Sequence, residues 1–354
     1  MDSGPGRQPA SPTDDHPGMT IERGRSLHIL ILGAAGMVGR KLTDRLLADG
    51  RLGSREITRM TLQDVVAPVR PPHASIAIQV VTSDLAEPGQ AAALVAHRPE
   101  VIFHLAAIVS GEAEADFDKG YRINLDGTKH LIDAIRAEGD DYHPRLVFTS
   151  SIAVFGAPFP QEIGDEFLSA PLTSYGTQKA ICELLIADYT RKGFFDGIGI
   201  RLPTICVRPG KPNKAASGFF SNIIREPLNG EEAVLPVSDE VMHWHASPRS
   251  AVGFLIHAAT MDTAAMGPRR SLSMPGLAAT VGEQIAALER VAGKAVAARI
   301  KREPDPTIIG IVAGWPRNFS ADRALKLGFT TAEKTFDDII RIHIEDELGG
   351  KFVA

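Results

Sequence analysis

The sequence predicts an α/β protein with a doubly wound parallel sheet and a smaller C-terminal lobe. A strand pattern ends in a glycine-spaced turn at Gly33, Gly36 and Gly39. After that turn, near-continuous apolar runs alternate with helical patterns as far as Thr204. Such runs are typical of parallel strands that are covered on both faces. With 354 residues, 44% of them hydrophobic, the chain has enough apolar side chains for a large core.

Each strand and helix follows from a local pattern. Short apolar runs predict strands at 27–32, 57–62, 78–81, 101–105, 145–149 and 197–204. Apolar residues spaced by three or four positions predict helices at 37–48, 90–97, 117–137 and 175–191. Beyond Thr204 the loops become rich in Pro and Gly, and helices are expected at 219–229, 249–260, 280–292 and 333–347. This second half predicts a lobe over the carboxyl edge of the sheet, where ligands of doubly wound folds bind.

Composition limits the classes of partner. The formal charge of −5 and the lack of a basic block make nucleic acid an unexpected partner. No apolar stretch reaches the length of a membrane span, so we expect no membrane partner. Cys182 and Cys206 fit reduced thiols in a cytoplasm. No metal is expected, because His243 and His245 lack a third ligand at suitable spacing and are interpreted as pocket wall or buried core.

The glycine turn predicts a dinucleotide site. The first glycine permits the tight turn, the second lets the backbone approach a pyrophosphate, and the third lets the helix pack on its strand. The helix that follows begins near Met37 and Val38. Its N-terminus would hold the pyrophosphate.

The pair Tyr175 and Lys179 predicts the acid–base group that takes a proton while hydride leaves the substrate. A spacing of four places both side chains on one helix face. A neighbouring cation favours a phenolate, and lowering a phenol pKa by about three units takes roughly 4 kcal/mol. Lys179 is therefore expected to lower the pKa of Tyr175 and to hold the nicotinamide ribose.

Together, the segments GAAGMVG (33–39), SSIAVFG (150–156) and SYGTQKA (174–180) resemble the extended short-chain dehydrogenase/reductase family, the group of NAD-dependent epimerases and dehydratases. The resemblance implies a Rossmann-type NAD-binding domain over 26–204 with a returning segment near 240–262. It leaves 205–239 and 263–354 as the substrate-binding lobe, and residues 1–25, rich in Pro, Gly, Ser and Asp, as a disordered tail.

The resemblance also implies roles for single residues. Ser151 would hydrogen-bond the reacting oxygen beside Tyr175 and Lys179, with Ser150 nearby. Asp64 would take the adenosine ribose hydroxyls and favour NAD over NADP. The interval from Gly39 to Asp64 is longer than usual, and the extra residues fit a loop at 51–55. Further cofactor contacts are implied for Asp84, Leu85, Leu105, Ala106, Ala107, Asn124 and Pro203.

Departures from the family pattern narrow the activity. Ile152 and Ala153 stand where dehydratases carry an Asp-Glu pair, so dehydration is not expected. Val241 stands where nucleotide-sugar epimerases carry an arginine that grips a diphosphate. The usual Asn after the sixth strand is also replaced, in Leu202-Pro203-Thr204.

The basic loop at 208–214 and the helix after it predict a site for a small anion. Arg208, Ser217 and Arg225 are the expected substrate contacts, whereas Lys211 and Lys214 fit a solvated loop equally well. The pattern resembles family members that oxidise a four-carbon sugar acid at its second carbon. This implies D-erythronate as substrate and 2-dehydro-D-erythronate as product.

Three classes of function remain open on the sequence alone. They are a hydroxy-acid dehydrogenase, an epimerase or reductase of sugar derivatives, and a non-catalytic nucleotide-binding protein. The intact Ser151, Tyr175 and Lys179 disfavour the third class. The family also implies a homodimer formed through the helices at 117–137 and 175–191.

Overall fold

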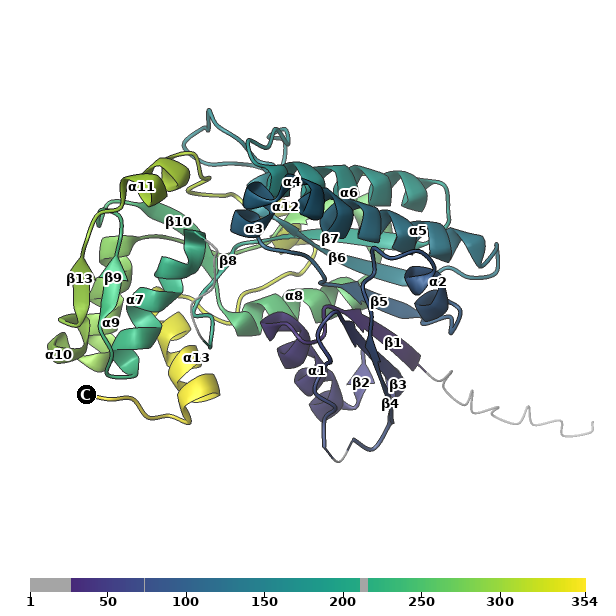
Figure 1. Ribbon diagram of the computed structural model, residues 1–354, viewed down its shortest axis with the longest axis horizontal. Coiled ribbons are helices and arrows are strands. Elements are labelled where there is room, and N and C mark those ends of the chain that lie inside the picture. Colours follow the sequence, from purple (N-terminus) through teal and green to yellow (C-terminus); the bar gives the residue numbers. More distant parts are fainter. Residues whose placement is uncertain (1–26, 73, 211–215) are drawn as a thin grey trace, which may run out of the picture.

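A parallel sheet forms the centre of the protein in the computed structural model, which describes residues 27–72, 74–210 and 216–354 (Figure 1). Its parallel strands are β4 (Ala77–Thr82), β3 (Arg55–Asp64), β1 (Leu27–Leu32), β5 (Val101–His104), β6 (Arg145–Ser151), β7 (Asp196–Leu202) and β11 (Ser271–Ser273), in that spatial order. The short β2 (Arg51–Leu52) pairs antiparallel with β3. The predicted tail at 1–25 lies outside the described residues. The predicted fold class is confirmed.

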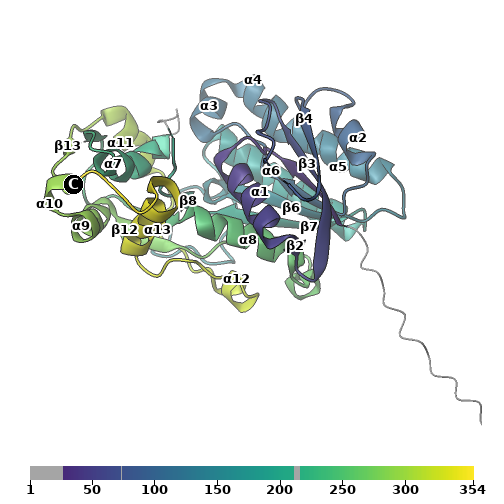
Figure 2. The ribbon, with the colours of Figure 1, turned by 90° about the horizontal axis from the view of Figure 1, so that it is seen from below.

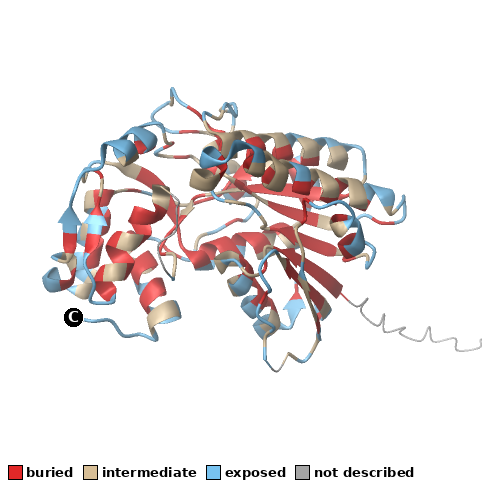
Figure 3. Ribbon diagram, in the orientation of Figure 1, coloured by how far each residue is buried: buried red, intermediate tan, exposed pale blue. Residues whose placement is uncertain are grey.

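Helices cover both faces of this sheet. One face carries α2 (Gln90–Val95), α5 (Gly127–Ala137) and α6 (Ser174–Arg191). The other carries α1 (Met37–Asp49) and α8 (Pro248–Thr260), which lie side by side in Figure 2. Side chains of β1 alternate between the two layers: Ile29 and Ile31 pack with α1 and α8, and Leu30 and Leu32 pack with α5 and α6. Every residue of β1 is buried, as the red central strands of Figure 3 show.

Before α5 the chain forms short helical turns at the carboxyl edge of the sheet. They are α3 (Ser110–Ala115), α4 (Phe117–Gly120) and the π-helical turn η1 (Tyr121–Asp126). A 3-10 turn, η2 (Ile152–Val154), follows β6. The helix predicted at 117–137 is therefore divided into three segments.

A second core fills the smaller lobe, on the left of Figure 1. Its helices are α7 (Phe219–Leu228), α9 (Val281–Ala292), α10 (Lys294–Ala297), α11 (Pro306–Ala313) and α13 (Phe336–Leu348). A small sheet joins β8 (Thr204–Ile205), β10 (Met242–Ala246) and β12 (Leu277–Thr280), and β9 (Ala233–Leu235) pairs with β13 (Ile300–Arg302). The 3-10 turns η3 (Ala216–Gly218) and η4 (Thr263–Met266) and the short α12 (Asp322–Lys326) complete the described elements.

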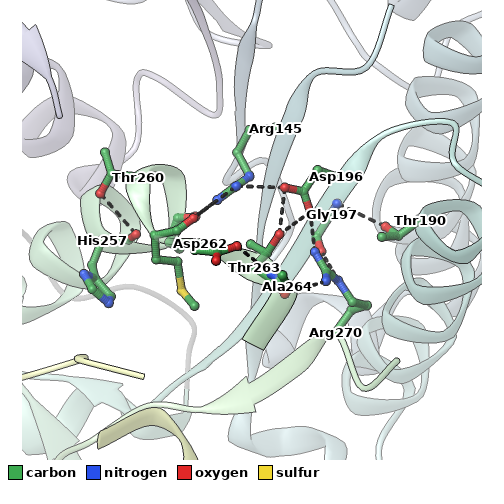
Figure 4. A network of polar contacts seen from close by, with 12 residues as sticks. Arg145, Thr190, Asp196, Gly197, His257, Thr260, Asp262, Thr263, Ala264 and Arg270 are labelled. Atoms are coloured by element: carbon green, nitrogen blue, oxygen red, sulfur yellow. Dashed lines mark hydrogen bonds and ion pairs between the residues drawn. The ribbon is translucent and has the colours of Figure 1, made fainter. Parts of the chain in front are cut away.

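The chain returns from the smaller lobe to the large sheet over the consecutive elements α8, η4 and β11. A polar network fixes this return (Figure 4). Arg145 of β6 and Arg270, just before β11, both pair with Asp196 of β7. Arg145 also donates to the carbonyl of Ala258 at 2.7 Å, and Arg270 donates to that of Gly197 at 2.8 Å. The range 263–354, assigned from the sequence to the smaller lobe, therefore includes one strand of the large sheet, because a run of three residues gives no periodic signal.

Candidate active site

A cavity of about 430 Å³ opens between the two lobes at the carboxyl edge of the large sheet. Fourteen of the residues predicted for the cofactor and substrate line it: Gly33, Gly36, Met37, Val38, Gly39, Leu105, Ala107, Ser150, Ser151, Tyr175, Lys179, Pro203, Arg208 and Ser217. The smaller lobe contributes further wall residues, including His243 and Trp315. The structure therefore brings these residues together around one cavity, with the two lobes as its walls.

The glycine turn forms one end of the cavity. Gly33 has a φ of +85°, and a Cβ there would lie 2.7 Å from the amide nitrogen of Ala106, so only glycine fits. Gly36 is the residue before α1, and with Met37 and Val38 it faces the cavity. A helix N-terminus with no side chain at its entry fits a pyrophosphate, so these residues fit a dinucleotide.

Asp64 lies beside this turn, although it does not line the cavity itself. Its carboxylate accepts hydrogen bonds from the backbone amides of Ala35 at 2.9 Å and Val66 at 3.3 Å. The extra residues between Gly39 and Asp64 form the β2–β3 hairpin rather than an open loop. The carboxylate is thus held at the end of β3, next to the turn.

Asp84, Leu85, Ala106 and Asn124 support the cavity from outside its wall. The carboxylate of Asp84 pairs with Arg122 at 2.8 Å and accepts from the amide of Ala86 at 2.9 Å. Asn124, buried in η1, accepts from the amide of Ile108 at 2.9 Å and donates to Gln178 at 2.8 Å. Asn124 therefore fixes a segment of the cavity wall, because Ile108 lines it.

Ser151, Tyr175 and Lys179 come together on one side of the cavity. Ser151 ends β6, and Tyr175 lies in the first turn of α6, which Thr173 caps by accepting from the amide of Gly176 at 3.1 Å. A Cβ on Gly176 would clash with the carbonyl oxygen of Ala153 in η2, so the glycine allows α6 to approach the segment directly after β6 closely.

Lys179 lies one turn further along α6. Its ammonium donates to the carbonyl of Thr149 at 2.8 Å and lies 5.7 Å from the ring centre of Tyr175. Burial lowers the pKa of Lys179 to about 8, while Cys182 and Glu183 oppose the shift. The ammonium form therefore still predominates at neutral pH.

The pKa of Tyr175 is set by opposing effects. Burial raises the pKa of this phenol, while the Ser151 hydroxyl and the positive charge of Arg208 lower it. Arg208 is thus a cation that acts on Tyr175 in this structure, in addition to the role expected for Lys179. In balance burial prevails, and the pKa of Tyr175 lies above its ordinary value. The lowering of this pKa by Lys179 stays a prediction.

Arg208 faces the cavity from the smaller lobe's side. Its Nε donates to the carbonyl of Ile205 at 3.0 Å, and its Nη2 donates to the hydroxyl of Ser217 at 3.0 Å. No carboxylate among the described residues forms an ion pair with it. Its guanidinium is therefore a positive charge at the cavity that is oriented by neutral groups. Lys211 and Lys214 lie outside the described residues.

Arg225 does not line the cavity. It is 6% exposed, donates to the backbone carbonyl of Arg208 at 2.7 Å, and pairs with Glu226 at 2.5 Å. The helical spacing placed it near the basic loop, but α7 turns its side chain toward the backbone of that loop.

Ser150 lines the cavity, yet its hydroxyl donates to buried Glu183, which pairs with Arg201 at 2.6 Å.

Sequence reasoning missed several wall residues. Thr204 follows Pro203 and meets His243, which lies 39 positions later, because β8 and β10 are paired. Trp315 contacts His243 with ring centres 5.3 Å apart. The helix before it, α11, could have been found from Asp305 and Pro306, which are a typical cap and first residue of a helix. The interpretation of His243 as pocket wall agrees with its position.

Two absences apply to the described part of the chain. Nowhere in it do three or more His, Cys, Asp or Glu side chains gather as metal ligands would. None of its helices combines the length and the apolar character needed to cross a lipid bilayer.

Comparison with known proteins identifies the class. The model of the NAD dependent epimerase/dehydratase family matches residues 29–246, and the chain belongs to this family. D-erythronate dehydrogenase from Cupriavidus necator is 46% identical over 90% of this chain and 98% of its own length. D-erythronate dehydrogenase from Haemophilus influenzae is 41% identical over 91% of this chain and 100% of its own length.

A solved structure extends the likeness. The nucleoside-diphosphate-sugar epimerase from Agrobacterium tumefaciens superposes with a TM-score of 0.90 at 65% identity, covering 92% of this chain and 96% of that one. With its family and its dehydrogenase relatives, the protein is an NAD-dependent dehydrogenase, and its cofactor is NAD.

Proposed function

We propose that the protein oxidises D-erythronate at its second carbon to 2-dehydro-D-erythronate. The observation that carries this proposal is the guanidinium of Arg208, which faces the cavity near Tyr175 without a carboxylate partner among the described residues. A buried cation is costly unless it is paired. The carboxylate of a sugar acid would supply the missing charge and place the adjacent carbinol near the phenol. The names of the two curated relatives agree with this substrate.

Each residue has a definite part in the proposed reaction. Tyr175, as phenolate, takes the proton of the substrate's C2 hydroxyl. Ser151 donates a hydrogen bond to the same oxygen and orients it as it becomes a carbonyl. Lys179 holds positive charge beside the phenol and would hold the ribose of the cofactor when it binds. NAD, when bound on the glycine turn near Asp64, supplies the acceptor for the hydride.

A second candidate is epimerisation of a nucleotide sugar. The name of the 65% identical structure from Agrobacterium tumefaciens favours it. Val241 disfavours it, because an aliphatic side chain cannot bind a diphosphate.

Substrate panels separate the two candidates. Purified protein is incubated with NAD and with C4 to C6 aldonates, and NADH formation is followed by absorbance. Turnover is expected with at least one aldonate and to be greatest with D-erythronate. The absence of NADH across the panel, together with interconversion of nucleotide sugars, would replace the proposal by epimerisation.

We also propose that the active form is a cytoplasmic homodimer that pairs through α5 and α6. Leu184 on α6 has 73% of its surface exposed in the single chain, which fits a residue that a partner would cover. Sedimentation should show a dimer for the natural protein and a monomer for Leu184→Glu. A natural protein that sediments as a monomer would contradict this assembly.

A further inference from the structure

Thr204 and His243 form a polar pair in the wall of the cavity. Both side chains line it, and Thr204 Oγ1 lies 2.7 Å from His243 Nε2. They come from neighbouring strands, β8 and β10. The other ring nitrogen, His243 Nδ1, lies 2.9 Å from the carbonyl oxygen of Pro316. The imidazole is thus held between a carbonyl and a hydroxyl.

These contacts fix which atom carries each proton. A carbonyl oxygen can only accept a hydrogen bond, so His243 Nδ1 must carry a proton and donate the hydrogen bond to the carbonyl of Pro316. Burial and the charge of Arg208 lower the pKa of His243 to about 4, so the ring is neutral at pH 7. In a neutral imidazole the second nitrogen has a lone pair and no proton. His243 Nε2 therefore accepts, and the hydroxyl of Thr204 donates to it.

The packing around His243 keeps this arrangement in place. The ring is 3% exposed and stacks on Phe220 with ring centres 5.2 Å apart and planes 1° from parallel. Trp315 contacts the ring as well, at 5.3 Å. A ring held by two aromatic neighbours and two hydrogen bonds cannot turn over to reverse the direction of donation.

The oxygen of Thr204 is consequently a ready acceptor at the cavity. Its proton is committed to His243, and its remaining lone pairs have no donor among the side chains of the described residues. We propose that Thr204, oriented by His243, is a subsite that accepts a hydrogen bond from a second hydroxyl group of the substrate. The inference rests on the proposed function and deepens it, because it selects polyhydroxy acids over their deoxy analogues.

The test compares D-erythronate with 2,4-dihydroxybutanoate and 2,3-dihydroxybutanoate of the same configuration at the reacting carbon. The natural protein should prefer D-erythronate over one of these analogues by about tenfold or more in kcat/KM. Thr204→Val removes the hydroxyl at nearly constant volume. It should lower kcat/KM for D-erythronate by about tenfold and change the value for that analogue by less than about twofold. Thr204→Ser, which keeps the hydroxyl, should retain the preference.

Thr61→Val is the matched control. Thr61 Oγ1 lies 2.9 Å from Nε2 of His28, another buried pair, but it does not line the cavity. This variant should keep the natural preference, and NAD binding should be unchanged in all three variants. A Thr204→Val protein that still prefers D-erythronate over both analogues overturns the subsite. A natural protein that oxidises no sugar acid overturns the proposed function, and the subsite with it.

Discussion

Replacing Arg208 with Met tests the charge on which the proposed substrate site depends. Among the described residues, only Ile205 and Ser217 accept from the five N–H groups of this guanidinium, one each, and the other three remain for a carboxylate. A hydrogen bond to a charged group contributes about 1.5–3 kcal/mol. Losing the charged contact should therefore cost about 3 kcal/mol of substrate binding, or about a hundredfold in kcat/KM.

Arg208→Lys separates charge from geometry. The ammonium keeps the positive charge near Tyr175 but cannot make the contacts of a planar guanidinium. We expect this variant to lose about tenfold in kcat/KM, since it keeps one charge-assisted hydrogen bond.

The two variants should also differ in their pH dependence. The charge of Arg208 lowers the pKa of Tyr175, so its removal raises that pKa. Oxidation needs the deprotonated phenol, and kcat/KM should rise with pH through the pKa of the free enzyme. The rise should move to higher pH in Arg208→Met and stay in place in Arg208→Lys.

Initial rates of NADH formation over a range of D-erythronate concentrations and pH values give both quantities. Thermal unfolding and NAD binding serve as controls, because the Met variant leaves Ile205 and Ser217 without their donor. The reasoning is refuted if a folded Arg208→Met protein keeps the natural KM for D-erythronate and the natural pH profile.

Three further predictions concern the base, the cofactor and acid stability. Tyr175→Phe should bind NAD normally, as fluorescence titration would show, and lose about a thousandfold in kcat; retained turnover would mean that another group is the base. Asp64→Ala should weaken NAD binding by about tenfold and reduce the preference for NAD over NADP. If the natural protein already has equal kcat/KM with NAD and with NADP, Asp64 does not select the cofactor. Burial lowers the pKa of four histidines to about 3 or 4: His28, His104, His243 and His343. As the pH drops from 6.5 toward 4, the unfolded chain binds more protons than the folded one, so the free energy of unfolding should fall by about 1.4 kcal/mol per pH unit for each histidine. Urea unfolding at pH 7 and pH 5 checks this, and equal stability at both would contradict it.

Much of the fold could be predicted from the sequence, because its central elements carry strong local signals. The first strand agrees with β1 at both ends, since a run of five apolar residues, interrupted only by His28, precedes a glycine turn. Weak signals explain the misses. The helix expected at 117–137 is interrupted by η1, where buried Asn124 bonds to Gln178 instead of facing solvent. The edge strand β11 has three residues and becomes a strand only by pairing with β7.

The site was predicted as far as contiguous motifs reach. The glycine turn, Ser151, Tyr175 and Lys179 lie at strand and helix ends whose positions follow from local patterns. Arg225 shows where that reasoning stops, because helical spacing does not tell which neighbour a side chain will meet. Its contact with the carbonyl of Arg208 depends on how α7 packs against the loop.

The return of the chain to the large sheet over α8 and β11 bears on how the protein is made. A ribosome releases residues in order, so β7 appears long before Arg270 and β11 are available to its edge. Until then, Asp196 lacks one of its two cations and the face later covered by α8 is open to water. Synthesis must pass residue 273 before the nucleotide-binding half can close. A fragment ending at residue 204 should therefore aggregate rather than fold.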